Sequence, residues 1–453
     1  DITKYETVLE HIRRLEQQVV SPYFARVDFT FPGDTGPKKI YIGRHSLRQR
    51  HDIRVHDWRA PVASLFYRYS LGEASYEAPV GTIAGTISLK RQYEIQDGKL
   101  EYYFDADIEI LDEYLRQLLC QNASEKMKSI VETIQREQDI IIRDAASDVL
   151  VVQGVAGSGK TSVALHRIAY LMYKGLTNRL GYQNIAILSP NNVFERYISN
   201  VLPELGEESV NAFVLEELFA EIIGMRNMQT RFALIEQIMV GEDDWAPIMQ
   251  SSFAFKCSKA FVRLLDIAAA TFADILCAYT DLFEQPDTLA RAAQAAGIQL
   301  PQDIDDIIQF TRENLRSSTL FFDDASALVY LYLKHIGTEQ YLQIRQVVID
   351  EAQDYEYLHY QIVKLLFPGA KYTILGDINQ TMNKTEDMGF YQDILDVFDK
   401  KRSAVLTLDK SFRCTNEIIQ FCASIIGQKI QTFGRGGQWP LVRKLQDEND
   451  LDR

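Results

Sequence analysis

The sequence predicts an α/β protein with a parallel sheet, an N-terminal β-rich module and an inserted all-helical domain. Three observations lead to this fold class. Alternating hydrophobic residues dominate 20–105, short apolar runs alternate with helical patterns from about residue 148, and 210–340 shows helical patterns alone. The composition, with 46% hydrophobic and 25% charged residues, is ordinary for a globular protein.

The β-rich module follows a predicted helix over residues 4–20, whose apolar side chains recur every three or four positions. Alternation over 27–31 then predicts a strand. Farther on, 83–96 and 99–104 flank Asp97-Gly98, a dipeptide typical of a two-residue hairpin turn. Because 107–144 has a helical pattern, we expect a β-rich module between two helical segments.

The parallel sheet is predicted from apolar runs, each separated from the next by a helical pattern. These runs are 148–153, 184–189, 345–350, 371–376 and 404–408. No strand pattern appears in 210–340, whose helical patterns break at Pro247, Pro286 and Pro301. We interpret this segment as a helical insertion between two strands of one sheet.

The net charge of −15, from 48 Lys and Arg against 63 Asp and Glu, is concentrated in one segment. Residues 201–330 carry 21 acidic and 8 basic side chains, whereas 38–59 is locally basic. Taken over the whole chain, such a balance argues against a protein that simply coats nucleic acid, because phosphate contacts need cationic surface. The acidic segment is either a solubilising face or a surface that docks in a basic channel, and both readings stay open.

The cysteines and the hydropathy pattern favour a cytoplasmic protein. The five cysteines are an odd number and lack metal-binding spacing, which is typical of a reducing compartment. No apolar run approaches the roughly 18 residues needed to span a bilayer. The nearest run, 267–278, is interrupted by Asp274, so we expect no membrane association.

A nucleotide-binding motif occupies residues 154–161, which read GVAGSGKT and match G-x-x-x-x-G-K-[ST] in full. An apolar strand precedes it and a helical pattern follows it, so backbone N–H groups would surround phosphates at a helix N-terminus. The residues predicted to hold the nucleotide there are Gly154, Gly157, Ser158, Gly159, Lys160 and Thr161. Lys160 would reach the β- and γ-phosphates, and the Thr161 hydroxyl would ligate Mg²⁺. The motif predicts ATP and Mg²⁺ as cofactors.

A second motif ends the apolar run 345–350 and continues as Asp350-Glu351-Ala352-Gln353-Asp354. The carboxyl end of a strand is where doubly wound sheets bind ligands. Asp350 would hold Mg²⁺, and Glu351 would accept a proton from the attacking water. Alone, this segment could equally be an acidic helix N-terminus. Together with the P-loop, it predicts an ATPase.

In this order, the two motifs resemble those of superfamily 1 helicases of the UvrD/Rep/PcrA group, which carry RecA-like ATPase domains. Further segments match motifs of that group, namely 134–138 (IQREQ), 376–380 (GDINQ) and 411–415 (SFRCT). The resemblance, which covers about 134–430, implies that Gln138 contacts adenine and that Gln380 senses the γ-phosphate. It also implies that Phe412 stacks on adenine and that Arg413 acts as an arginine finger in catalysis.

The chain departs from these helicases where they contact nucleic acid. In place of an aromatic-rich segment whose rings stack on single-stranded bases, residues 381–386 read TMNKTE. The strand-contacting T-F-T-N-K segment is altered to LSPNN at 188–192, without its lysine. We therefore expect weak or indirect contact with DNA beside a retained ATPase. Nothing after Arg413 matches the later motifs, so a second RecA-like domain is expected to be incomplete or absent.

The N-terminal module has a signature of its own, YIGR at 41–44 followed by DWRAP at 57–61. By itself this segment reads as packing, with Asp57 and Arg59 as a local ion pair. It also resembles the head region of HelD-type proteins, helicase-like ATPases that bind bacterial RNA polymerase. That resemblance implies core RNA polymerase as a partner and an ATP-dependent release or recycling of the polymerase from nucleic acid.

With these resemblances, the chain divides into six expected segments. They are 1–20, a helix that could be the stump of a coiled-coil arm; 21–120, the head module; 121–210 and 341–430, two parts of the first RecA-like ATPase domain; 211–340, the acidic helical insertion; and 431–453, the start of a further, truncated region. Two alternative functions stay open: a DNA helicase or translocase, and a nucleotide-gated interaction protein with little turnover.

Overall fold

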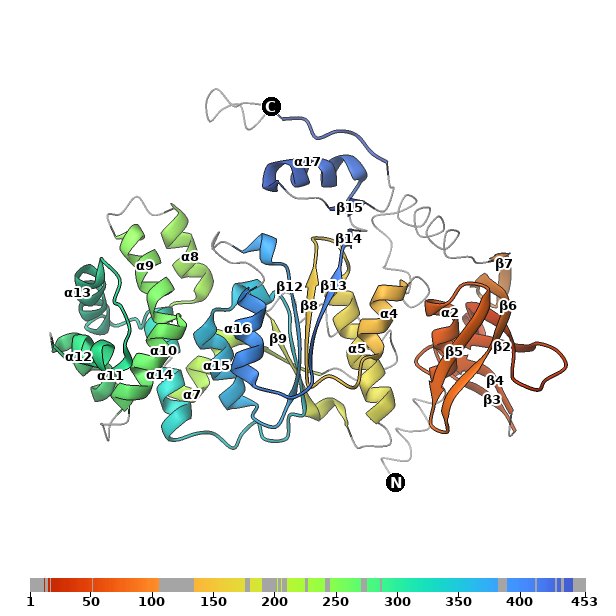
Figure 1. The fold of residues 1–453 in the computed structure, drawn as a ribbon, viewed down its shortest axis with the longest axis horizontal. Coiled ribbons are helices and arrows are strands. Elements are labelled where there is room, and N and C mark those ends of the chain that lie inside the picture. The colour runs from red at the N-terminus through yellow and green to blue at the C-terminus, as the bar shows by residue number, and fades with distance from the viewer. Residues whose placement is uncertain are drawn as a thin grey trace.

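The computed structural model shows a β-rich head, a parallel sheet flanked by helices, and a helical domain, which lie from right to left in Figure 1. The residues it describes are 12, 15–16, 18–50, 52–105, 134–175, 180–189, 202, 205, 210–224, 227–240, 245–269, 275–285, 287–381, 389–411, 414–427, 430–432 and 436–442. This architecture confirms the predicted α/β class. Of the predicted N-terminal helix, positions 12, 15–16 and 18–20 are described and helical.

The head is a seven-stranded sheet in the order β3-β4-β2-β1-β6-β5, with β7 paired to β6. Its strands are β1 (Ala25–Thr30), β2 (Lys38–Gly43), β3 (Leu47–Gln49), β4 (Asp52–Asp57), β5 (Gly72–Ala78), β6 (Gly81–Gln96) and β7 (Lys99–Asp105). The predicted hairpin is confirmed, because Asp97 and Gly98 join β6 to β7 with φ values of 49° and 74°. A positive φ at both central residues is typical of a type I′ turn, whose backbone twist matches that of the two strands it joins.

The second sheet has six strands, all parallel, in the order β10-β9-β11-β12-β8-β13. They are β8 (Val149–Gly154), β9 (Ile185–Ser189), β10 (Asn211–Val214), β11 (Gln346–Ile349), β12 (Lys371–Gly376) and β13 (Ser403–Leu408). Five of them are the predicted apolar runs. The sixth, β10, was not expected, because it is a short edge strand with an exposed Asn211 and only partly buried neighbours. The helical insertion therefore begins after Val214.

Helices cover both faces of the parallel sheet and form the domain at its far side (Figure 1). Before the insertion lie α2 (Ser64–Arg68), α4 (Arg136–Arg143) and α5 (Lys160–Gly175). The insertion contains α7 (Leu215–Ile223), α8 (Arg231–Val240), α9 (Ala246–Lys256), α10 (Lys259–Ala269), α11 (Ile275–Glu284), α12 (Thr288–Ala296), α13 (Ile304–Leu315) and α14 (Phe322–His335). After it come α15 (Tyr357–Leu366), α16 (Gly389–Phe398), the short strands β14 (Lys410–Ser411) and β15 (Gln431–Thr432), and α17 (Asn416–Ile426). Among the described helices, none has the length and hydrophobicity of a membrane span.

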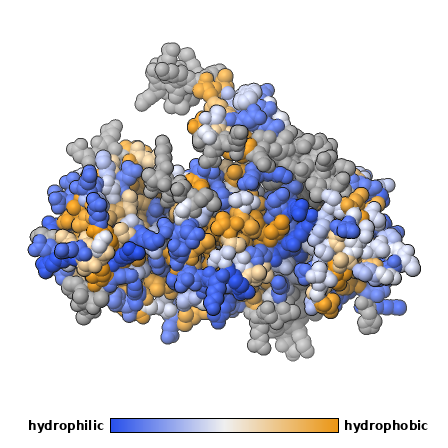
Figure 2. All heavy atoms as spheres, in the orientation of Figure 1, coloured by the Kyte–Doolittle hydropathy of each residue, from blue (hydrophilic) through white to orange (hydrophobic). Residues whose placement is uncertain are grey.

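Alternation along the central strands divides the hydrophobic core into two clusters. Val149 and Val151 of β8 belong to a cluster that continues into the helical domain. Leu150 and Val152 point to the other face, in a cluster that α5 and the head share. Figure 2 shows hydrophobic side chains gathered near the middle of one face, with hydrophilic side chains on both sides. The head therefore packs on the face of the sheet that α5 covers, and a continuous apolar core joins the two.

Candidate nucleotide-binding site

The P-loop joins the end of β8 to the start of α5, and its glycines are required by its geometry. Gly157 and Gly159 have φ values of 76° and 83°, in the left-handed region that favours glycine. A Cβ atom on Gly154 would lie 2.6 Å from the Ser158 Oγ and 2.7 Å from the Lys160 Cγ, so a side chain there would force these two P-loop side chains to move. The turn leads directly into the N-terminus of a 16-residue helix, where a positive potential favours an anion such as a phosphate.

Two polar side chains of the P-loop are buried. The Lys160 Nζ donates to the Gly154 carbonyl at 2.9 Å, and the side chain is 8% exposed. The Ser158 Oγ is fully buried and has no hydrogen-bond partner within the described part of the chain. Within the described residues, a buried hydroxyl without a partner and an ammonium that donates to a backbone carbonyl fit a phosphate, which would accept from both.

Asp350 lies beside the P-loop at the end of β11. Its Oδ2 accepts a hydrogen bond of 2.7 Å from the Thr161 Oγ1, and its Oδ1 accepts the Glu351 N–H at 3.0 Å. The carboxyl is 1% exposed, and burial raises its pKa to about 6, with the charge of Glu351 acting in the same direction. Ionising this buried carboxyl therefore costs free energy. A divalent cation between the phosphates, Thr161 and Asp350 would offset that cost.

The described residues contain no group of three or more His, Cys, Asp or Glu side chains placed to hold a metal ion. The donor set at the P-loop is one carboxylate and one hydroxyl. Mg²⁺ commonly binds through one or two protein oxygens, with the remaining positions filled by substrate phosphates and water. Thr161 and Asp350 therefore fit Mg²⁺ that arrives with a nucleotide.

Glu351 is connected by hydrogen bonds to the predicted γ-phosphate sensor. Its φ of 50° and ψ of 52° place it in the left-handed region, a strain found mainly at functional sites. The Gln353 Nε2 donates to the Glu351 Oε2 at 2.8 Å, and the Gln353 Oε1 accepts the Asp377 N–H at 2.9 Å. The Asp377 Oδ2 in turn accepts from the Gln380 Nε2 at 2.9 Å. The carboxyl ends of β11 and β12 thus form one polar network.

Two further residues belong to this network and were not predicted from the sequence. Gln153, near the end of β8, donates from Nε2 to the Asp377 Oδ1 at 2.9 Å and accepts at Oε1 from the Ile378 N–H at 3.1 Å. The Tyr391 hydroxyl also donates to the Gln153 Oε1. The available signal was a polar residue in an otherwise apolar strand, one position before the P-loop.

Gln138 also contacts the P-loop. It lies at the N-terminus of α4, where its Oε1 accepts the Gln135 N–H at 3.1 Å and its Nε2 donates to the Ser158 carbonyl at 3.1 Å. Phe412 and Arg413 fall outside the described residues, as do 382–388, so their predicted roles stay predictions. The preceding Ser411 does reach the site, because its Oγ donates to the Ala156 carbonyl at 2.7 Å.

Comparison with known families agrees with this geometry. The family described as "AAA domain" matches residues 137–386, more than half of the chain. The family described as "DNA helicase IV HelD, N-terminal domain" matches residues 3–118. The chain belongs to the first family, as a HelD-type helicase-like protein of superfamily 1.

Curated relatives of this HelD-type protein include two ATP-dependent DNA helicases named PcrA. The protein of Staphylococcus epidermidis strain RP62A is 24% identical over 320 residues, which are 68% of this chain and 42% of the relative. The protein of Staphylococcus aureus strain COL is 23% identical over the same shares. The chain thus spans less than half the length of the curated relatives it matches.

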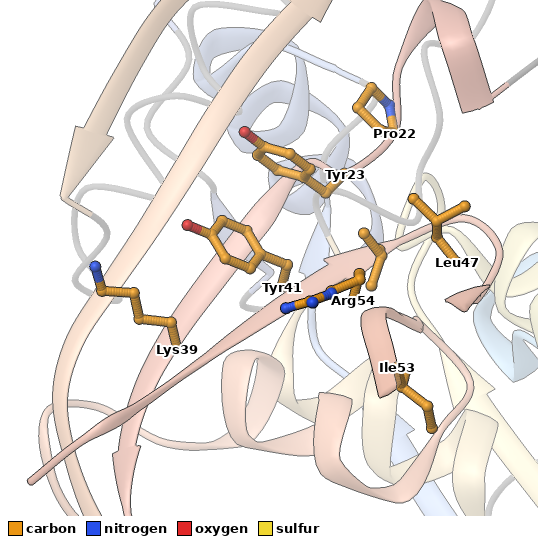
Figure 3. Close-up of a pocket in the computed structure, with 8 residues that line it drawn as sticks. Pro22, Tyr23, Lys39, Tyr41, Leu47, Ile53 and Arg54 are labelled. Carbon is orange, nitrogen blue, oxygen red and sulfur yellow. The ribbon is translucent and has the colours of Figure 1, made fainter. Parts of the chain in front are cut away.

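The head of this HelD-type protein carries a separate hollow of about 480 Å³. Figure 3 shows Tyr23 and Tyr41 on one side of it and Arg54 close by, with Lys39 farther along the rim. The two tyrosine rings are 4.8 Å apart, and Pro22, Leu47, Ile53 and Val55 complete the lining. The hollow combines aromatic, aliphatic and cationic side chains, and it shares no residue with the P-loop.

Proposed function

We propose that this HelD-type protein binds and hydrolyses ATP with Mg²⁺, and that it releases or recycles bacterial RNA polymerase from nucleic acid in the cytoplasm. The contact between the Thr161 hydroxyl and the buried Asp350 carboxylate carries the ATPase part. It joins two motifs that lie far apart in the sequence at one point, beside the N-terminus of α5, which suits phosphates.

Each residue of the site has a proposed role. The P-loop backbone and Lys160 would hold the phosphates, and Thr161 and Asp350 would hold Mg²⁺, which neutralises charge on the transferred phosphoryl group. Glu351 would accept a proton from water, oriented by its hydrogen bond from Gln353. Gln380 would report the γ-phosphate through Asp377, and Phe412 and Arg413 would contribute an adenine contact and a transition-state cation.

The polymerase part rests on the N-terminal family match and on surface chemistry. The head belongs to a segment found in HelD-type proteins, and its hollow offers aromatic and cationic side chains to a macromolecule. The acidic 201–330 would meet a basic channel, whereas it would repel a phosphate backbone. We propose only weak or indirect contact with DNA, because 381–386 lacks base-stacking aromatic residues.

A DNA helicase or translocase is the second candidate, and the similarity to PcrA favours it. The two candidates differ in what stimulates turnover. A translocase couples hydrolysis to single-stranded DNA, whereas a polymerase-release factor couples it to the polymerase. A third candidate, in which ATP only sets conformation, predicts that turnover has no consequence for the partner.

The test combines a pull-down with core RNA polymerase and a steady-state ATPase assay. We expect the protein to retain core polymerase, to release it with ATP, and to show little stimulation by single-stranded DNA. Glu351→Gln should lower turnover by about 10²–10⁴-fold while ATP binding persists, and it should block the ATP-dependent release. Glu356→Gln is the matched control, because Glu356 caps α15 from the same loop and an amide can still cap.

Three outcomes would contradict parts of the proposal. Duplex unwinding with strong stimulation by single-stranded DNA would favour the helicase. Unchanged release by a Glu351→Gln variant that binds ATP without hydrolysing it would favour the nucleotide-gated protein. Equal loss of turnover in both Glu variants would remove Glu351 from its proposed role.

A further inference from the structure

The segment 57–61 of the head is seated on the helix that follows the P-loop. Asp57 and Arg59 form a buried ion pair, with 2.8 Å between Oδ2 and Nη2. The Arg59 guanidinium lies 4.9 Å from the centre of the Tyr173 ring, and the Trp58 ring lies 5.5 Å from the His166 ring, edge-on. Because Tyr173 and His166 both belong to α5, this segment links the head to the nucleotide-binding helix.

A second set of contacts links the same segment to α4. The Arg143 Nη1 donates to the carbonyls of Arg59 and Ala60 at 2.9 and 3.2 Å, and its Nη2 donates to the Trp58 carbonyl at 2.5 Å. The Arg143 Nε donates to the Asp139 Oδ1 at 2.7 Å. Arg143 therefore joins three head carbonyls to one carboxylate of α4.

Asp139 receives a second cation from the head. The Arg68 Nε donates to the Asp139 Oδ2 at 2.5 Å, and Asp139 is fully buried. Arg68 ends α2, so the two oxygens of one α4 carboxylate are held by a cation of α4 and a cation of the head. This arrangement sets both the position and the rotation of α4 relative to the head.

The residue beside Asp139 is Gln138. Its amide contacts the P-loop carbonyl of Ser158, and it also closes the N-terminus of α4 through Gln135. In a helix of eight residues, a rotation about the helix axis moves the first-turn side chains together. Any shift of Asp139 would therefore displace the Gln138 amide from the nucleotide site.

We propose that Arg68, acting through Asp139, is a positioning residue that orients Gln138 and so sets the preference of the site for adenine. This inference rests on the proposed nucleotide binding. An amide can donate to and accept from the N7 and N6 edge of adenine, whereas the same edge of guanine offers only acceptors. The preference depends on orientation, because a misdirected amide loses both hydrogen bonds at once.

The same contacts make the head responsive to nucleotide. A nucleotide that holds Gln138 stabilises the position of α4 to which Arg68 and 57–61 bind. By linkage, if nucleotide binding strengthens the seating of the head on α4 by some factor, the seated head strengthens nucleotide binding by that same factor. The segment 57–61 thus has a role beyond packing, as the joint between the head and the ATPase site.

Arg68→Gln tests this proposal with little risk to folding. The Arg68 side chain is 32% exposed, and Asp139 keeps Arg143 as a partner after the change. We would measure the dissociation constants of ATP and GTP by competition against a fluorescent ATP analogue. The ATP affinity should fall by about 5- to 10-fold, the lower end of what losing two hydrogen bonds would cost, while the GTP affinity stays within about twofold.

Three further variants make the result decisive. Gln138→Ala should narrow the preference for ATP over GTP to the same extent as Arg68→Gln. Combining the two substitutions should narrow the preference no further. Arg68→Lys should restore part of the preference, since an ammonium can still pair with Asp139. Arg26→Gln is the matched control, because Arg26 pairs with Asp28 within β1 at 2.5 Å and should leave the preference unchanged.

An equal loss of ATP and GTP affinity in Arg68→Gln would show a general structural role and overturn the proposal. A preference that survives in Arg68→Gln but disappears in Gln138→Ala would overturn it as well. If the unmodified protein binds neither nucleotide, the proposed function itself fails, and this inference fails with it.

Discussion

Ion pairs are buried in two places, at the junction between the head and α4 and inside the helical domain. The two places differ in the kind of cation and in the ratio of cations to carboxylates. At the junction, two arginines, Arg68 and Arg143, share the single carboxylate of Asp139. In the helical domain, one lysine, Lys256, lies between Asp323 and Asp324, at 3.1 and 2.5 Å. The first cluster carries an excess of positive charge and the second an excess of negative charge.

The difference follows from what each cluster connects. A planar guanidinium can hold a carboxylate and backbone carbonyls together, which suits a joint between two parts of the chain. The helical cluster instead joins α9, α11 and α14, where Ser252 donates to Asp323 at 2.6 Å and Tyr279 donates to Asp324 at 2.5 Å. The Asp324 Oδ2 is buried and has no partner within the described residues. One carboxylate in this cluster is therefore costly to ionise.

The largest expected effect comes from removing the lysine. Lys256→Met would leave two buried carboxylates without a cation and should lower the free energy of unfolding by about 3–5 kcal/mol. Urea denaturation followed by circular dichroism would measure it. Lys259→Met is the control, because its pair with Asp393 is about half exposed and should contribute less than about 1 kcal/mol. Similar losses in the two variants would mean that burial does not distinguish these ion pairs.

The second prediction concerns pH, because burial raises the pKa of Asp324 to about 6 from an ordinary value of 3.8. The folded state therefore binds a proton at Asp324 more tightly than the unfolded state does. The stabilisation of the folded state by this proton is complete below the ordinary pKa and is lost as the pH rises through about 6. Relative to Asp324→Asn, the unmodified protein should gain up to about 3 kcal/mol as the pH falls from about 7 to about 4.

Denaturation of both proteins across this pH range would measure the gain. Thr311→Val is the control, since it removes a fully buried hydroxyl of the same domain that does not titrate. Its difference from the unmodified protein should stay constant with pH. A constant difference for Asp324→Asn as well would show that the excess negative charge of the helical cluster is neutralised in some other way.

The two clusters also show what the sequence could and could not predict. The P-loop, Asp350 and five strands of the parallel sheet were predictable, because their signals are local runs and spacings. The contacts of Asp139 with Arg68 and of Arg143 with the Trp58 carbonyl were not, because the partners are 71 and 85 residues apart. The Asp57–Arg59 pair was predicted from its spacing of two residues, but its seat on α5 depends on the fold.

Strand β10 and Gln153 were not predicted from the sequence either. Strand β10 was missed because an edge strand needs little hydrophobicity, and Asn211 is exposed. Gln153 was missed because its partner Asp377 lies 224 residues away, although Gln153 lies on β8 and Asp377 directly follows the neighbouring strand β12. Motif order predicts which chemistry is present, whereas the polar network that orients it depends on strand order.

The smallest expected effect tests whether the shape of the cation matters at the junction. Arg59→Lys keeps the charge beside Asp57 but loses the paired hydrogen bonds from Nε and Nη2, each 2.8 Å long, and the contact with the Tyr173 ring. We expect a loss of about 1 kcal/mol in the free energy of unfolding. Arg26→Lys loses a pair of similar geometry with Asp28, but in a more exposed setting, and should cost less. If Arg59→Lys left the free energy of unfolding unchanged, the planar shape of the guanidinium would not matter at this junction. A point charge such as that of Lys256 would then stabilise it equally well.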